Sequence, residues 1–141
     1  MPATFESFGI KFLYPDNWTV AQRAEDEGDN GMTLDMPSGG FFAIEVENEG
    51  LDDDEVIAKI ADTIKAEYNE VEVEDVTLEG ASRGERAAEM RFYYLDLLIV
   101  SRVVLLKATG ETLVVQIQAE SRDFDENELV FAAILQQIRP A

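Results

Sequence analysis

Apolar and polar residues alternate along several short stretches of the first 50 positions, which is the spacing of half-buried β-strands. In Gly9–Tyr14, for example, Ile10, Phe12 and Tyr14 fall on one face. The stretches that we expect to be extended are 9–14, 18–23, 32–36 and 42–46. They are separated by segments rich in Pro, Gly, Asp and Asn, which favour turns, at 15–17, 25–31 and 37–40. This part of the chain therefore predicts about four short strands.

The period changes to that of an amphipathic helix in two segments. The first follows Leu51, and its apolar residues recur at helical spacing: Val56, Ile57, Ile60, Ile64 and Tyr68. The second segment, 125–138, closes the chain, and we expect it to stop at Arg139-Pro140 because Pro cannot continue a helix.

Between these helices the alternation returns over 70–79, 88–94 and 113–120. The stretch 97–106 (LLIVSRVVLL) is apolar at successive positions, as in a central strand covered on both sides. A hairpin turn is expected at 108–111. The order predicts a single α+β domain over 1–141, with an antiparallel sheet of about six to eight strands, a long C-terminal meander and two main α-helices packed on it.

Two acidic clusters share one pattern: apolar, Asp, two residues, Glu, apolar. They are LDDDEV at 51–56 and FDENEL at 124–129. This pattern predicts helix N-termini, with Asp52 and Asp125 as N-caps and Glu55 and Glu128 closing capping boxes. The alternative for the first cluster is adventitious binding of a divalent cation, although the alternating acids and the glycine of a calcium loop are missing.

The formal net charge of −19 comes from 30 acidic and 11 basic residues. Nucleic acids and anionic membranes are bound through Lys and Arg, so we expect neither as a partner. The stretch 45–79 holds 14 acids and two bases. It is either a solvated surface or an attractive surface for a basic peptide. Solubility or a high-salt habitat would also explain the charge.

The first residues show no basic segment followed by an apolar one, and the longest apolar run, 97–100, is far shorter than the ~20 residues of a membrane span. We therefore expect a cytoplasmic protein.

The chain contains no His and no Cys. Their absence removes Ser-His-Asp and Cys-His catalysis and nearly all zinc, haem and iron–sulfur ligation. The glycines match no phosphate-binding motif. With 30 acids, some pair of carboxylates will always lie at hydrolase distance, so such a pair is uninformative without a cleft. We expect no catalytic residue, no cofactor and no metal. A small-ligand-binding protein or a carboxylate-based hydrolase remains the alternative.

Four residues are candidates for contact with a partner: Trp18, Phe41, Tyr93 and Arg102. Trp and Tyr are frequent anchors of interfaces, although packing inside the domain would explain these aromatic residues equally. Arg102 interrupts the apolar stretch 97–106. If buried, it needs an acidic partner; otherwise it emerges at the sheet surface or pairs across a dimer contact.

The chain also resembles the PsbP/Mog-like superfamily, which includes DcrB-like proteins. The resemblance lies in GIKFLYPDNWTV (9–20), GGFFAIEVE (39–47), the helix after Asp52 and FDENELVFAAILQQIR (124–139), and thus in almost the whole chain. It implies an antiparallel sheet with packed helices and non-enzymatic work: binding a GTPase, docking on a photosystem, or acting as a small dimeric chaperone for secreted toxins.

Taken together, these features predict a non-enzymatic protein-binding module, a small cytoplasmic chaperone or adaptor. We expect it to use an apolar sheet face or groove with an acidic rim, and to form a homodimer.

Overall fold

The structure is a computed structural model that describes residues 2–21, 30–108 and 110–140. Most of the predicted loop 25–31, the end of the extended segment 18–23 and position 109 of the predicted turn lie outside the described residues. The strands are β1 (Ala3–Ser7), β2 (Ile10–Tyr14), β3 (Thr19–Val20), β4 (Gly31–Asp35), β5 (Phe41–Val46), β6 (Glu72–Val76), β7 (Arg86–Tyr94), β8 (Leu97–Ala108) and β9 (Glu111–Glu120). The helices are α1 (Asp53–Glu67) and α2 (Ser121–Ile138).

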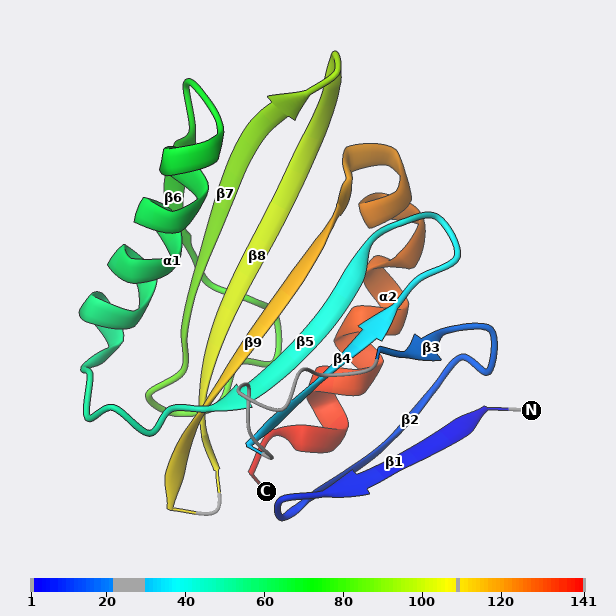
Figure 1. Cartoon of the computed structure of the whole chain (residues 1–141). Helices are drawn as coiled ribbons and strands as arrows, with labels where there is room; N and C mark the ends of the chain where they lie inside the picture. The colour runs from blue at the N-terminus through cyan, green and yellow to red at the C-terminus, as the bar shows by residue number, and fades with distance from the viewer. Residues whose placement is uncertain (1, 22–29, 109, 141) are drawn as a thin grey trace.

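Seven of the described strands form one sheet in the order β3-β4-β5-β9-β8-β7-β6, while β1 and β2 form a separate hairpin (Figure 1). All strand pairs are antiparallel. β6 to β9 follow one another as the predicted C-terminal meander, and β9 then pairs with β5 to join the N-terminal strands to the same sheet. The α+β class and the antiparallel sheet with two packed helices are confirmed.

The two helices lie on opposite faces of the sheet (Figure 1). Strand β8 shows why 97–106 is apolar at successive positions. Val103 and Leu105 belong to the core under α1, whereas Val104 and Leu106 belong to the core under α2. Successive side chains of a strand point to opposite faces, so a strand between two helices must be apolar on both.

The core under α1 is the smaller one. The helix buries Val56, Ile57, Ala61 and Ile64 against β7 and β8. Just after the helix, the ring of Tyr68 stacks on Phe92 with 4.3 Å between the ring centroids. Burial of each large aliphatic side chain contributes about 1.5–3 kcal/mol, which fixes the helix on this half of the sheet.

The core under α2 is larger and includes the β1–β2 hairpin. Aromatic rings from distant segments meet there: Phe12, Trp18, Phe42 and Phe131. Trp18 lies 6.0 Å from Phe131 between ring centroids, and only 5% of the residue is exposed. The prediction of Trp18 as a partner-binding residue is therefore wrong for this structure, because its side chain is part of the core.

The predicted N-terminus of the first helix is confirmed. Asp52 is the N-cap of α1, and its Oδ1 accepts a hydrogen bond from the Glu55 N–H at 2.9 Å. In return, the Glu55 carboxylate accepts a bond from the Asp52 N–H at 3.2 Å. Asp53 and Asp54 lie in the first turn, where the helix dipole favours negative charge.

The predicted N-terminus of the second helix is wrong. α2 already begins at Ser121, and Glu120 is its N-cap, with a side chain that accepts a hydrogen bond from the Arg122 N–H. Asp125 and Glu128 therefore lie inside the helix instead of capping it. The physical reason is that β9 ends at Glu120, so the last residue of the strand also caps the helix and no loop is needed.

Strand β1 has no counterpart in the sequence prediction, because Phe5 is its one large apolar residue. It pairs with β2 across a two-residue turn in which Phe8 and Gly9 both have positive φ. The predicted strand 70–79 is shorter in the structure, since β6 covers only Glu72–Val76. Neither helix of the described residues combines the length and the apolar character needed to cross a membrane.

Candidate functional site

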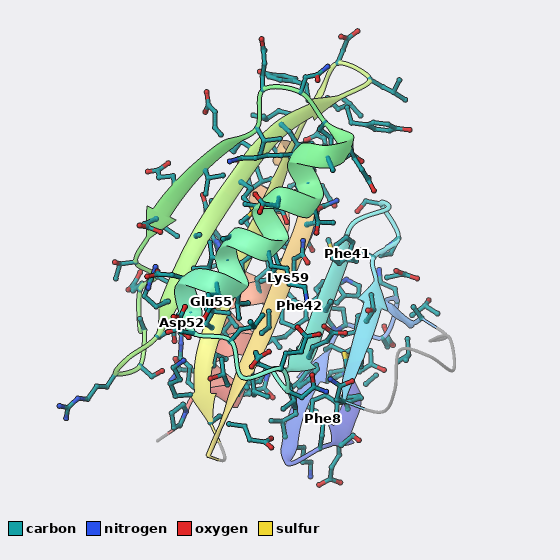
Figure 2. All side chains as sticks on the ribbon, turned by 60° about the vertical axis from the view of Figure 1, so that its left-hand side comes forward. Phe8, Phe41, Phe42, Asp52, Glu55 and Lys59 are labelled. Carbon is teal, nitrogen blue, oxygen red and sulfur yellow. The ribbon has the colours of Figure 1, made fainter. Side chains whose placement is uncertain are left out.

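α1 covers only part of its face of the sheet. The helix lies over β7 and β8, and Phe41 of β5 lies to one side of it (Figure 2). The strand register places Thr33, Ala43 and Gln116 in one row across β4, β5 and β9, on the same face as Val103 under the helix. These three residues are partly exposed, and among the described residues no helix covers them. We call the face of β4, β5 and β9 on the α1 side the open face.

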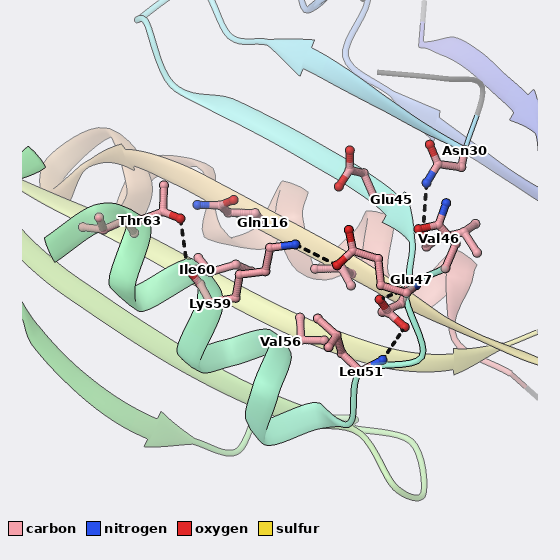
Figure 3. Close-up of a pocket in the computed structure, with 14 residues that line it drawn as sticks. Asn30, Glu45, Val46, Glu47, Leu51, Val56, Lys59, Ile60, Thr63 and Gln116 are labelled. Carbon is pink, nitrogen blue, oxygen red and sulfur yellow. Dashed lines mark hydrogen bonds and ion pairs between the residues drawn. The ribbon is translucent and has the colours of Figure 1, made fainter. Parts of the chain in front are cut away.

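A groove with a cavity volume of about 240 Å³ separates α1 from the β5 side of the sheet (Figure 3). Apolar side chains from β9, the β5–α1 loop and the helix line it: Leu51, Val56, Ile60, Ile64 and Val114. Its polar residues stand at the mouth and include Glu45, Glu47, Glu49 and Lys59. Pockets for small molecules typically hold about 300–1,000 Å³, so this groove is small for a complete ligand and adequate for a side chain or two.

The β5–α1 loop forms one wall of the groove, and the side chain of Glu47 holds this loop in place. Both of its carboxylate oxygens are used, since Oε1 accepts from the Glu49 N–H at 2.9 Å and Oε2 from the Leu51 N–H at 3.1 Å. On the other side of β5, the side-chain amide of Asn30 donates to the Val46 carbonyl at 3.1 Å. These bonds satisfy loop backbone groups that would otherwise cost free energy near an apolar surface. Glu47 is thus a structural residue of the groove.

Lys59 reaches across the groove from α1 to the loop. Its ammonium Nζ lies 2.9 Å from Oε2 of Glu49, and Figure 3 shows the side chain extended over the groove. The hydrogen bond to Glu49 raises the pKa of Lys59 above its ordinary value, and the negative charges of Glu49, Glu47 and Glu45 add to this effect. The mouth of the groove therefore stabilises a positive charge.

The ion pair that spans the groove is weak. Both partners are largely exposed, with 60% of the Lys59 side chain and 57% of the Glu49 side chain accessible to solvent. Exposed pairs of this kind contribute only about 0.2–1 kcal/mol and are screened by salt. The ion pair between Lys59 and Glu49 can therefore break at a small cost in free energy.

Two of the carboxylates and the lysine of the groove already have partners. Glu47 is held by two backbone donors and Glu49 by Lys59, and a raised pKa keeps Lys59 protonated. Among the described residues, no group of three or more Asp or Glu side chains is arranged to hold a metal ion. Asp52 and Glu55, the predicted alternative for a divalent cation, use their carboxylates to cap α1.

The structure does not bring the four predicted partner-binding residues together. Trp18 is in the core, and Phe41 lies at one end of the open face, opposite Gln118 of β9. Gly40 allows this arrangement, because a Cβ at that position would lie 2.7 Å from the carbonyl oxygen of Gln118. Of the four, Phe41 alone is near the groove side of the sheet.

Tyr93 lies at the far tip of the β7–β8 hairpin and is 67% exposed. The turn there consists of Leu95 and Asp96, both with positive φ, and 78% of Leu95 is accessible to solvent. Tyr93 pairs with Leu98 in the register, so it points to the α2 side of the sheet, away from the open face. The role of Tyr93 in partner binding stays a prediction.

Arg102 is buried inside the domain, with 8% of the residue exposed. Its Nε donates to Glu89 at 2.8 Å and a terminal nitrogen contacts Glu128 of α2 at 2.9 Å. The guanidinium also lies 4.8 Å from the centre of the Phe124 ring. Of the alternatives predicted for Arg102, the structure therefore shows the buried arginine with acidic partners. One of these partners is Glu128, which was predicted as a helix cap.

Sequence reasoning missed the groove. It recognised an acid-rich stretch at 45–79 but did not single out Lys59 or the apolar residues Leu51 and Ile60. The available signal was the sequence EVENEG at 45–50, in which three glutamates alternate beside a helix with a lysine on its second turn. The alternation alone does not reveal that both carboxylate oxygens of Glu47 accept hydrogen bonds from the loop backbone.

Comparison with known proteins supports the fold. No protein-family model and no curated protein sequence matches the chain. Among solved structures, it is similar to the crystal structure of a protein of unknown function from Pseudomonas aeruginosa that is described as a suggested regulator. The two share 12% sequence identity with a TM-score of 0.55, over 99% of this chain and 97% of the other. At this identity the likeness establishes a shared α+β fold with an antiparallel sheet.

Proposed function

We propose that this chain is a non-enzymatic protein-binding module, a small chaperone or adaptor that holds a segment of another protein in the groove and on the open face. The observation that carries the proposal is the incomplete cover of the sheet: α2 and the β1–β2 hairpin close one face, whereas α1 leaves β4, β5 and β9 without a helix among the described residues. A sheet face with a neighbouring apolar groove offers a second segment both packing and polar contacts.

The side chains of the open face suit a protein segment better than a small reacting molecule. Phe41 and Ala43 provide apolar area, and Thr33 and Gln116 provide hydrogen-bonding groups. A carboxylate-based hydrolase would need convergent carboxylates in a cleft with one of them poised to donate a proton. Glu47 is instead bonded to loop N–H groups and Glu49 to Lys59, which favours binding over catalysis.

The resemblance to PsbP/Mog-like proteins agrees with this proposal, but it stays a prediction since no family model matches. Cytoplasmic location and homodimer formation also belong to the proposal, as the resemblance suggests them.

The test places an arginine on the open face. Ala43→Arg puts a long side chain in the middle of the row formed by Thr33, Ala43 and Gln116. Ala66→Arg, on the exposed surface of α1, adds the same charge elsewhere. Affinity capture from the native cell extract should yield a partner with the unmodified chain and with Ala66→Arg, and at least tenfold less of it with Ala43→Arg.

Equal capture by both variants would show that the open face is not the binding surface. Circular dichroism of each variant is needed beside the capture, so that loss of binding is separated from loss of the fold.

A further inference from the structure

We infer that the groove between α1 and β5 selects a cationic side chain on an apolar stem, so the bound protein segment presents a Lys or Arg flanked by apolar residues. This inference rests on the proposed function and names the chemistry of the segment that the groove receives. It depends on three features of the same groove: its apolar floor, its acidic mouth and the position of Lys59.

The floor accepts an apolar stem. Leu51, Val56 and Ile60 line it from the loop and the helix, and Val114 lines it from β9. A cavity of about 240 Å³ accommodates an aliphatic chain of several carbons. Each buried methylene group contributes about 0.8 kcal/mol, so even a short chain gains measurable binding free energy here.

The mouth favours a cation. Glu45, Glu47 and Glu49 follow one another at alternate positions along the end of β5 and the loop after it. The hydrogen bond to Glu49 raises the pKa of Lys59, and the negative charges of Glu49, Glu47 and Glu45 add to this effect, in keeping with a mouth that favours an ammonium beside Glu49. An anionic or neutral occupant would lose this contribution, and the net charge of −19 would repel an anion further.

Lys59 already shows the arrangement that an occupant would adopt. Its ammonium binds Glu49 at 2.9 Å while its side chain spans the groove. Because the pair is largely exposed and weak, a cation from a partner can replace Lys59 at Glu49. Lys59 is therefore an internal competitor for the site, and its removal should strengthen the binding of a cationic occupant.

The experiment compares three probes of equal length: hexylammonium, hexanol and hexanoate. Their binding is followed through the backbone amide resonances of the groove residues in nuclear magnetic resonance spectra of the whole chain. We expect hexylammonium to shift the resonances of 45–51, 59–63 and 114–116, with an affinity at least fivefold higher than that of hexanol. Hexanoate should bind more weakly than either.

The variants sharpen the test. Lys59→Met keeps the length of the side chain and removes the competitor, so hexylammonium should bind several-fold more tightly, whereas Lys65→Met, outside the groove on the same helix, should change nothing. Glu49→Gln should weaken hexylammonium and leave hexanol unchanged. Glu47 is not varied, because it holds the loop.

Two other outcomes would contradict the cation preference of the groove or its use in binding. Equal affinity for hexylammonium and hexanol, or weaker binding to Lys59→Met, would refute the selection of a cation and leave the proposed protein-binding function standing. No shift of the groove resonances with any probe would overturn both the inference and the use of the groove in the proposed function.

Discussion

Arg102 illustrates at the scale of one residue how a charge is accommodated inside this domain. It occupies a position of β8 that faces α2, where its neighbours in the same core include Val100 and Val104. The register places Glu89 of β7 directly opposite, and Glu128 reaches the guanidinium from α2. Two charges taken out of water repay their desolvation only when they are paired and hydrogen-bonded, as they are here.

Removal of Glu89 should therefore be costly. In Glu89→Gln, Arg102 stays buried with Glu128 as its remaining carboxylate, and we expect the free energy of unfolding to fall by about 3 kcal/mol. Glu128→Gln is the matched control: the side chain of Glu128 is about half exposed, so its loss should cost less than about 1 kcal/mol. Urea denaturation of both variants measures the difference.

A third variant separates the charge from the packing. In the double variant Glu89→Met/Arg102→Met no buried charge is left unpaired, and stability should return most of the way to that of the unmodified chain. Equal losses in Glu89→Gln and Glu128→Gln would show that burial does not set the strength of this pair.

At the scale of the element, the two helix N-termini show how similar sequences acquire different roles. LDDDEV follows a loop, so Asp52 is free to leave the helical conformation and cap α1, as its extended backbone shows. FDENEL follows residues that already continue from β9 into a helix. The unpaired N–H groups of the first turn therefore lie before Asp125, and its carboxylate has none of them to accept a hydrogen bond from. The pattern of side chains is the same, and the preceding segment decides which of them becomes a cap.

This difference predicts opposite results for the same substitution. Asp52→Ala should lower the free energy of unfolding by about 1 kcal/mol, the usual contribution of an N-cap. Asp125→Ala should change it by less than about 0.5 kcal/mol, because Ala is favourable inside a helix and Asp125 is exposed there. Thermal and chemical denaturation of the two variants provide the comparison, and a loss of about 1 kcal/mol from Asp125→Ala would contradict the observed start of α2.

Much of the fold could be predicted from the sequence because it depends on local periodicity. The alternation in 42–46, the helical spacing after Asp52 and the two-sided apolar stretch 97–106 each correspond to an element of the structure. The groove could not be predicted in this way. It depends on how far α1 extends across the sheet and on the bonds of Glu47 to its own loop, both of which are set by tertiary packing. The prediction for Trp18 was wrong for a related reason, since periodicity does not show that its ring packs against Phe42 and Phe131.

At the scale of the whole molecule, the dominant property is a net charge of −19 on 141 residues. The described acids are balanced only locally: Lys107 contacts Asp53, Arg86 contacts Asp54, and Arg139 forms a buried pair with Glu85. These pairs hold the ends of the helices against neighbouring segments. They leave most carboxylates to repel one another across the surface, and this repulsion opposes the compact state.

Stability should therefore rise as salt screens this repulsion. Between 0.01 M and 0.15 M NaCl the screening length falls from about 30 Å to about 8 Å, so repulsion across the molecule is largely removed. We expect the free energy of unfolding to increase by about 1–2 kcal/mol and Tm to rise by about 3–6 °C, as measured by calorimetry.

A variant with four exposed acids neutralised provides the control for this salt effect. Its substitutions are Asp62→Asn, Glu67→Gln, Asp125→Asn and Glu126→Gln, and all four positions are exposed in the structure. Because this variant starts with less repulsion, it should be more stable than the unmodified chain at 0.01 M salt and should gain less on addition of NaCl. A Tm that is independent of salt in the unmodified chain would show that its charges are spaced widely enough not to strain the fold. The acidic surface would then bear on the choice of partner alone, where the preference of the groove for a cation is expected to act.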